Sequence, residues 1–277
     1  MSHSELQKTL YGHLCQLTRE RDPFIATEGH FYTQQYLQSQ FEQWGAVESQ
    51  DFTVRGKIYS NWSLSLPGQT RLAPILVGAH YDTVVGSPGA DDNASGLAVL
   101  LALASTLAQS PPRRPVIFVA FDLEEYGLEG SRAWVARRTQ TGQPLHLMLS
   151  LEMLGYFSDA PRSQRYPAKP LEWVYPTRGN FIGLIGNWPT ILTMQRLKRH
   201  IKQAGTPCQW LPMVGQGNLL PATRRSDHAP FWDAGYPAIL VTDTADLRNP
   251  HYHQASDRIE TLNLAAMAGV CAGLAEG

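Results

Sequence analysis

Hydrophobic residues recur along the chain in short, nearly unbroken runs. Five of these runs occupy residues 74–79, 116–121, 147–151, 181–185 and 238–241. Apolar stretches of this length are typical of strands that are covered on both faces, as strands of parallel sheets are. The five runs therefore predict the central strands of one sheet.

Segments with helical spacing lie between several of these runs. After residue 27, apolar side chains recur mostly every three or four positions and predict one amphipathic helix that carries Tyr32, Tyr36, Leu37, Phe41 and Trp44. Further helices are predicted to start near 93 and to cover about 129–138, 189–203 and 262–275. Residues 46–66 break at 55–57 and are predicted as two strands.

Alternation of strands and helices predicts an α/β fold with a mostly parallel, twisted, mixed sheet that helices flank on both faces. The 277 residues contain no internal repeat and no low-complexity linker, so we expect a single domain over residues 1–277. Two irregular stretches, 158–180 and 213–225, interrupt the pattern. Each is equally compatible with a binding loop and with a plain surface insertion.

Composition narrows the choice of partners. A net charge of −1 provides no bulk basic field for nucleic acid or for an anionic membrane. No run approaches the roughly 18–20 apolar residues that span a bilayer. The first residues lack the apolar core and cleavage site of a signal peptide, and the three cysteines lie far apart in the sequence. We therefore expect a cytoplasmic protein without partners of either kind.

Polar clusters follow the apolar runs where the predicted strands end. They are His80-x-Asp82, Asp91-Asp92, Glu124-Glu125, Glu152 and His251-Tyr252-His253. Each cluster alone has an ordinary interpretation, such as a helix cap or a solvated turn. However, ligands of open α/β sheets bind outside the carboxyl ends of the strands, so these side chains are expected to share one edge. Acids gathered there would repel one another unless cations lay among them.

Histidines and carboxylates without cysteine suit zinc, and also manganese or cobalt. Two divalent ions would balance three carboxylate ligands and one hydroxide, and a bridging carboxylate would hold the ions about 3.5–4 Å apart. Neighbouring side chains in Glu124-Glu125 diverge, so one acid can bind metal while the other transfers a proton. Asp82 can accept the second N–H of the His80 ring and thereby fix its tautomer.

Six sequence blocks resemble the zinc aminopeptidases that include bacterial leucyl aminopeptidases, with glutaminyl cyclases as relatives. The blocks are GAHYDTV (78–84), PGADDNASG (88–96), FDLEEYGLEGS (121–131), LSLEMLGY (149–156), RRSDHAPFWDAGYPAI (224–239) and HYHQASDRIETLN (251–263). They occur in the family's order and cover about residues 75–265. The resemblance implies a three-layer zinc-exopeptidase-like sandwich that forms one catalytic domain.

The resemblance also implies the ligands of two zinc ions. Asp92 resembles the bridging ligand, because it matches the second acid of the Gly-Ala-Asp-Asp block. His80 and Glu152 resemble the remaining ligands of one ion. Glu125 and His253 resemble those of the other, His253 being preferred to its neighbouring histidine because it stands four residues before an aspartate.

Further roles follow from the same resemblance. Glu124 resembles the general base and Asp82 the residue that orients the histidine ligand. Arg225 resembles an arginine near the substrate of some members. The peptide bond after Asp92 is expected to be cis, as it often is in the family.

Two positions depart from the best-known members. Glu152 stands where Asp is commoner, and Thr223 stands where some members have an oxyanion-stabilising tyrosine. Tyr252 is then a candidate for that donor role. The resemblance implies an aminopeptidase that releases N-terminal residues from peptides, or acts on similar amino-acyl substrates, through a water activated by two zinc ions. A glutaminyl cyclase-like acyltransferase and a non-catalytic binding module on the same fold are the alternatives.

Overall fold

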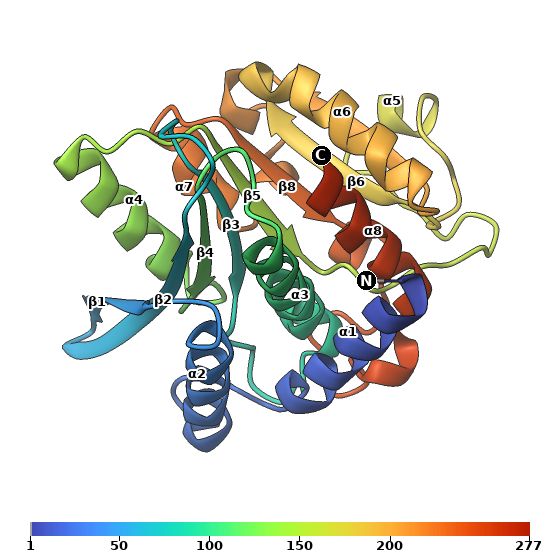
Figure 1. Cartoon of the computed structure of the whole chain (residues 1–277). Coiled ribbons are helices and arrows are strands. Elements are labelled where there is room, and N and C mark those ends of the chain that lie inside the picture. The colour runs from blue at the N-terminus through green and yellow to red at the C-terminus, as the bar shows by residue number, and fades with distance from the viewer. Residues whose placement is uncertain (1) are drawn as a thin grey trace.

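A computed structural model describes residues 2–277. Its eight strands form one twisted sheet in the order β1-β2-β4-β3-β5-β8-β6-β7 (Figure 1). The strands are β1 (Val47–Val54), β2 (Lys57–Leu66), β3 (Ile75–His80), β4 (Val116–Phe121), β5 (Leu147–Glu152), β6 (Ile182–Asn187), β7 (Cys208–Met213) and β8 (Ala238–Thr242). The four central strands β4, β3, β5 and β8 run parallel to one another, whereas β2 and β6 are antiparallel to their neighbours in this group.

Helices cover both faces of the sheet (Figure 1). One face is covered by α3 (Gly96–Gln109), α6 (Ile191–Gln203) and α8 (Leu264–Glu276), and α1 (His3–Leu17) packs on α3 and α8. The other face packs against α4 (Glu129–Thr141) and α7 (His228–Asp233), while α2 (Thr27–Phe41) lies against β2 and α5 (Lys169–Glu172) is a single short turn. The predicted three-layer α/β class is therefore confirmed.

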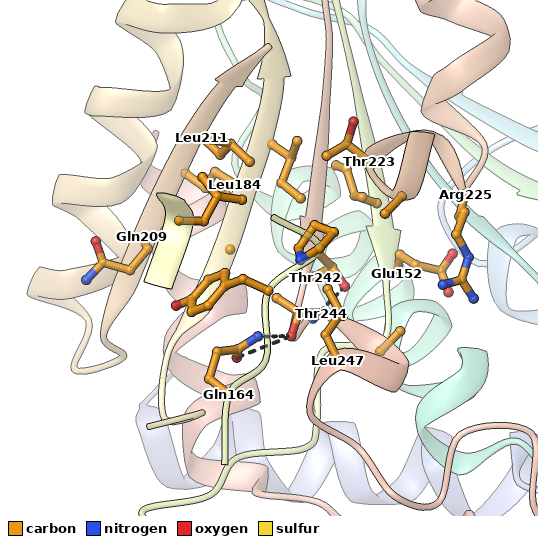
Figure 2. A pocket seen from close by; sticks show the side chains of 18 of the residues that line it. Glu152, Gln164, Leu184, Gln209, Leu211, Thr223, Arg225, Thr242, Thr244 and Leu247 are labelled. Atoms are coloured by element: carbon orange, nitrogen blue, oxygen red, sulfur yellow. Dashed lines mark hydrogen bonds between the residues drawn. The ribbon is translucent and has the colours of Figure 1, made fainter. Parts of the chain in front are cut away.

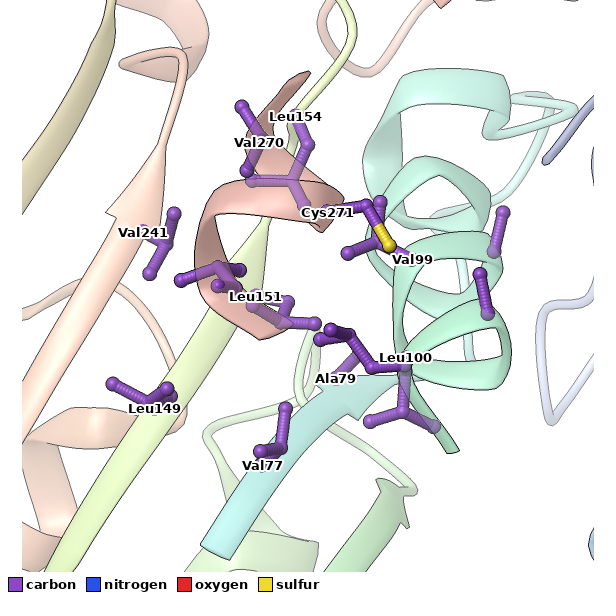
Figure 3. Close-up of a cluster of buried hydrophobic side chains, with 14 of the residues drawn as sticks. Val77, Ala79, Val99, Leu100, Leu149, Leu151, Leu154, Val241, Val270 and Cys271 are labelled. Carbon is purple, nitrogen blue, oxygen red and sulfur yellow. The ribbon is translucent and has the colours of Figure 1, made fainter. Parts of the chain in front are cut away.

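The side chains of each central strand alternate between two cores. In β3, Val77 and Ala79 belong to the larger core with α3 and α8, whereas Leu76 belongs to the smaller core under α4 and α7. Figure 3 shows Val77 and Ala79 next to Val99, Leu100 and residues of α8. Burial on both faces is the reason for the unbroken apolar runs in the sequence.

The structure divides the helical pattern of the first forty-odd residues between two helices and adds an edge strand that the apolar pattern does not predict. Helix α1 is separate from α2, and the edge strand β7 contains Trp210 and Pro212 with a mostly half-buried surface. A proline cannot donate to a sheet ladder, so its presence on an edge strand is expected and its interruption of the pattern hides the strand. No helix among residues 2–277 combines the length and apolar character needed to cross a membrane. The cytoplasmic location stays a prediction.

The parallel strands bring the predicted polar clusters to one edge. Strand β3 ends at His80, β4 ends just before Asp122, and β5 ends at Glu152. Between β3 and α3, residues Ala90–Ser95 form a buried turn whose backbone is kinked at Asp92 and Asn93. This turn carries Asp92, and the peptide bond Asp92–Asn93 is cis as expected.

Candidate metal centre

Six side chains at this edge form two adjacent groups, each with ligand atoms that all lie within 4.8 Å of one another. The first group contains His80, Glu124 and Glu152, and the second contains Asp92, Glu125 and His253. All five predicted ligands and the predicted general base are therefore brought together. They come from β3, β5 and three different loops.

Asp92 connects the two groups. Its Oδ1 atom lies 3.2 Å from His80 Nε2, and its Oδ2 atom lies 3.1 Å from His253 Nε2. His253 Nε2 also lies 3.2 Å from Glu125 Oε2, and His80 Nε2 lies 3.4 Å from Glu152 Oε1. One carboxylate thus faces two imidazoles, each of which faces a second carboxylate.

Asp82 shapes the loop after β4. Its two carboxylate oxygens accept hydrogen bonds from the backbone N–H groups of Glu124 and Glu125, both at 3.1 Å. The same Oδ1 atom lies 3.4 Å from Nδ1 of His80. Asp82 therefore holds the Glu124-Glu125 pair and also faces the back of the His80 ring.

Asp257 has a similar role for the turn formed by Ala90–Ser95. Its carboxylate accepts the backbone N–H groups of Asp91 and Asp92 at 2.9 and 3.1 Å. His253 belongs to the same C-terminal segment, so the turn and this histidine are tied together. His251, in contrast, lies 2.9 Å from Ser256 through its Nδ1 atom and takes no part in the group.

Burial and mutual repulsion raise the pKa values of two acids of the centre, Glu124 and Glu125. Burial raises the pKa of Glu124 well above its usual value, and Glu152 and Glu125 add to that rise while His80 opposes it. Burial, followed by the charge of Asp92, raises the pKa of Glu125 to about 8. These groups resist being ionised side by side, and cations among them would relieve the repulsion.

The donor set fits divalent metal ions. His253 Nε2 and Glu125 Oε1 are buried without a hydrogen-bond partner among the residues that the structure describes. The short distances from His253 to Asp92 and Glu125 lack hydrogen-bond geometry, which is the arrangement expected of donors that converge on a shared cation. Two histidines and three carboxylates without sulfur match the preferences of zinc and similar ions.

A pocket opens beside Glu152 (Figure 2). Its walls are mostly apolar and aromatic, and they include Tyr166, Leu171 and Tyr175 from the 158–180 segment. Ala222 and Thr223 from the 213–225 segment complete the opposite wall. Both irregular stretches therefore line a pocket, which their sequences alone did not reveal.

Arg225 and Tyr252 lie where this pocket meets the predicted metal ligands. The Tyr252 ring stacks on His253 with a centroid distance of 3.7 Å. An Arg225 Nη2 group donates to the Tyr252 hydroxyl at 3.1 Å, and Nη1 donates to Asp246 Oδ1 at 2.8 Å. The two predicted substrate-binding residues are thus in contact with each other, and Tyr252 also contacts the predicted ligand His253.

Two buried charged residues near the centre were given no role from the sequence. Asp227 is 1% exposed, and neither carboxylate oxygen has a hydrogen-bond partner among residues 2–277. Arg21 is completely buried in the segment between α1 and α2. Asp227 stands in the block at 224–239 that resembles the family, but nothing in the local pattern distinguishes Arg21 from an ordinary polar loop residue.

Solved structures of an aminopeptidase and of a glutaminyl cyclase share this architecture. The LapA aminopeptidase of Legionella pneumophila superposes with a TM-score of 0.75 at 20% identity, over 99% of this chain and 71% of that one. A glutaminyl cyclase of Macrostomum lignano superposes with a TM-score of 0.74 at 18% identity, over 99% of this chain and 89% of that one. At these identities the likeness establishes the fold.

Sequence comparison establishes the family. Residues 61–180 and 192–276 match peptidase family M28, and the chain belongs to this family. It is 36% identical to the uncharacterized protein YfbL of Escherichia coli K12 over 253 residues, which is 87% of this chain and 77% of that protein. It is 29% identical to leucine aminopeptidase 1 of Uncinocarpus reesii over 223 residues, or 73% of this chain. The matched region spans about half the length of three of these leucine aminopeptidases, at 50%, 52% and 50%, and from 65% to 71% of three others.

Proposed function

We propose that the chain is an aminopeptidase that binds two zinc ions and releases N-terminal residues from peptides. The observation that carries this proposal is the position of Asp92 between His80 and His253. A carboxylate shared by two histidine-containing groups is suited to bridge a pair of ions. The relatives named leucine aminopeptidase 1 support the reaction class.

The proposed ligands divide between two ions. His80 and Glu152 would hold one ion, Glu125 and His253 the other, and Asp92 both. When bound, the ions would polarise the scissile carbonyl and make the attacking water more acidic. The Ser226 hydroxyl donates to Glu152 Oε2 at 2.7 Å, which leaves Oε1 directed at His80.

Glu124 is the proposed general base. Its backbone is fixed by Asp82, and its carboxylate lies with His80 and Glu152 but is not required as a ligand. It would take a proton from the attacking water and return it to the leaving amine. The role of Asp82 is then twofold, since it would also hold the His80 ring with Nε2 directed at the ligands.

Tyr252 is the proposed donor to the carbonyl oxygen of the substrate. Arg225 donates to the Tyr252 oxygen, so the phenolic proton remains free to be donated elsewhere. Burial raises the pKa of Tyr252 above its usual value, which keeps that proton in place. The hydroxyl could thus replace the tyrosine that some members carry at the position of Thr223.

The pocket beside Glu152 would receive the side chain of the residue that is released. Its walls include Leu211, Ile185, Tyr166 and Tyr175, so an apolar side chain is expected there. Gln164 and Thr244 form a hydrogen-bonded polar pair in the same pocket (Figure 2).

The decisive experiment combines metal analysis with a substrate panel. We expect two zinc ions per chain, release of free amino acid from leucyl peptides, and no release from N-acetylated peptides. Cyclisation of N-terminal glutamine without hydrolysis would assign the chain to the glutaminyl cyclases instead. Metal binding without turnover of any member of the panel would point to a binding module.

A further inference from the structure

The segment between α1 and α2 reaches the metal centre from the N-terminal side. It precedes residue 61, where the match to the M28 family begins. Arg21 and Asp22 are adjacent in this segment, and both are fully buried. Each contacts a different loop that carries proposed ligands.

Arg21 contacts the loop that follows β3. Its guanidinium donates to backbone carbonyl oxygens of this loop at distances from 2.9 to 3.4 Å, namely those of Tyr81, Pro88, Gly89 and Asp92. It also donates to the carbonyls of Leu17 and Arg19 on its own side. No carboxylate accepts a hydrogen bond from this side chain among the contacts that the described residues make.

A guanidinium bonded only to carbonyls fixes the path of a backbone. The hydrogen bonds of Arg21 reach from Tyr81, the residue after His80, to the bridging Asp92. Arg21 therefore fixes the backbone positions from which the His80 and Asp92 side chains extend. The turn at Gly89 is close to it: with φ at +59°, a Cβ atom added there would lie 2.9 Å from Arg21 Nη2. The guanidinium and the turn are therefore in close van der Waals contact, with no room for a side chain at Gly89.

The charge of Arg21 also matters to the site. No acid pairs with it directly, but the carboxylates of Asp92, Asp257, Asp82 and Glu125 all attract it. A buried cation needs such compensation. Arg21 therefore contributes fixed positive charge beneath the cluster of acids.

Asp22 contacts the loop that follows β4. Its Oδ1 atom accepts the backbone N–H groups of Phe24 and Ile25 at 2.8 and 2.7 Å, which fixes the carboxylate. Its Oδ2 atom accepts a hydrogen bond from the Tyr126 hydroxyl. Tyr126 directly follows Glu125, and its ring packs edge-on against Phe24 at 4.7 Å.

We propose that Arg21 and Asp22 are positioning residues of the metal centre, Arg21 for the loop that carries Asp92 and Asp22 for the loop that carries Glu125. This inference rests on the proposed function, because it assigns a purpose to the segment through the ions. Two consecutive residues would then set the distance between the bridging ligand and a ligand of the second ion. A role in folding alone would lower stability but leave the affinity for metal in the folded protein unchanged.

The test compares Arg21→Met with Arg19→Met. Arg19 lies in the same segment and stacks on Tyr32, and its one side-chain hydrogen bond among residues 2–277 goes to the carbonyl oxygen of Gln16 rather than to a ligand loop. Dissociation constants for zinc are measured by competition with a chelator, and the cobalt-loaded proteins are compared by their visible absorption spectra. We expect Arg21→Met to weaken binding about 10–100-fold, as is typical when a group that supports ligands is lost, and to alter the cobalt spectrum. Arg19→Met should match the wild type in both measurements.

Two milder variants keep the test decisive if Arg21→Met does not fold. Arg21→Lys keeps the charge but loses the planar fork, and Tyr126→Phe removes only the hydroxyl that binds Asp22. Both should weaken zinc binding and shift the cobalt spectrum to a smaller extent. Folded variants that bind both ions with wild-type affinity and an unchanged spectrum would overturn the inference. If the wild-type protein itself bound no ions, the proposed function would fail first, and this inference with it.

Discussion

The Nε2 atom of His253 lies 3.1 Å from Oδ2 of Asp92, although the two residues are far apart in the sequence. The other oxygen of Asp92 lies 3.2 Å from His80. A single side chain therefore links the part of the centre built by the N-terminal strands to the part built by the C-terminal loop. This link makes the two proposed ion sites interdependent.

Asp92→Asn should consequently impair both sites at once. The amide keeps the size of the side chain but loses the negative charge that would be shared by the ions. We expect less than one zinc ion per chain after dialysis, and turnover close to background. Asp246→Asn, which changes an exposed acid outside the two groups, is the matched control and should retain the full metal content. Full zinc content in Asp92→Asn would contradict a bridging role.

Glu124→Gln should separate metal binding from turnover. Glutamine occupies the same space but cannot accept the proton of the attacking water. Loss of a general base typically costs about 10²–10⁴-fold in rate, so we expect kcat to fall by this factor while zinc content stays at two ions per chain. Elemental analysis and steady-state kinetics on one leucyl substrate measure both quantities. A variant with full activity would show that another group removes the proton.

The sequence predicted the central part of this site because strand ends carry positional information. Apolar runs that stop at His80 and Glu152 mark the carboxyl edge of a parallel sheet, and the two groups of acids fall at the same edge. Both cores, and with them the order of layers, follow from the same runs.

Other parts of the site depend on tertiary contacts that leave no local pattern. The pocket wall with Tyr166 and Tyr175 belongs to an irregular segment, whose side chains have no periodic relation to one another. The Arg21 side chain donates only to carbonyl groups among the described residues, so no acid at a recognisable spacing accompanies it. Strand β7 is hidden because its half-buried edge position tolerates Pro212.

Tyr252→Phe should test the proposed oxyanion donor. The phenyl ring keeps the stacking on His253, so the ligand should remain in place while the hydroxyl is lost. Removal of one donor to a developing oxyanion costs about 10²–10³-fold in kcat in a well-studied protease. We therefore expect a fall of this order with little change in KM or in zinc content. A change confined to KM would instead indicate that Tyr252 only binds the substrate.

Gly183→Leu should change the choice of substrate. A Cβ atom at Gly183 would lie 3.8 Å from Cγ2 of Thr244 and 3.3 Å from the carbonyl oxygen of Thr242, both of which line the pocket. A leucine side chain would therefore fill part of the space beside Glu152. Comparison of leucyl and alanyl substrates should show kcat/KM falling at least about tenfold for leucyl, roughly 1.4 kcal/mol, and much less for alanyl. Equal losses for both substrates would place the released side chain elsewhere.

His13 should make the protein less stable in acid, independently of the metal centre. The ring is buried in α1 and its Nδ1 atom lies 2.8 Å from the Tyr36 hydroxyl. Burial lowers the pKa of His13 from 6.5 to about 4 in the folded protein. Between these values the unfolded chain binds a proton that the folded chain rejects, so stability is full above pH 6.5 and falls as the pH approaches 4.

His13→Gln should flatten this dependence. One such histidine lowers the free energy of unfolding by on the order of 3 kcal/mol between pH 6.5 and 4. The glutamine variant should lack this decrease. Urea unfolding at several pH values measures the difference, with His3→Gln at an exposed position as the control. Burial also lowers the pKa of His228 to about 4, and this residue remains in every variant. The loss of stability between pH 6.5 and 4 should therefore be reduced in His13→Gln but not abolished. Parallel stability curves for His13→Gln and the wild type would show that His13 is protonated equally in both states.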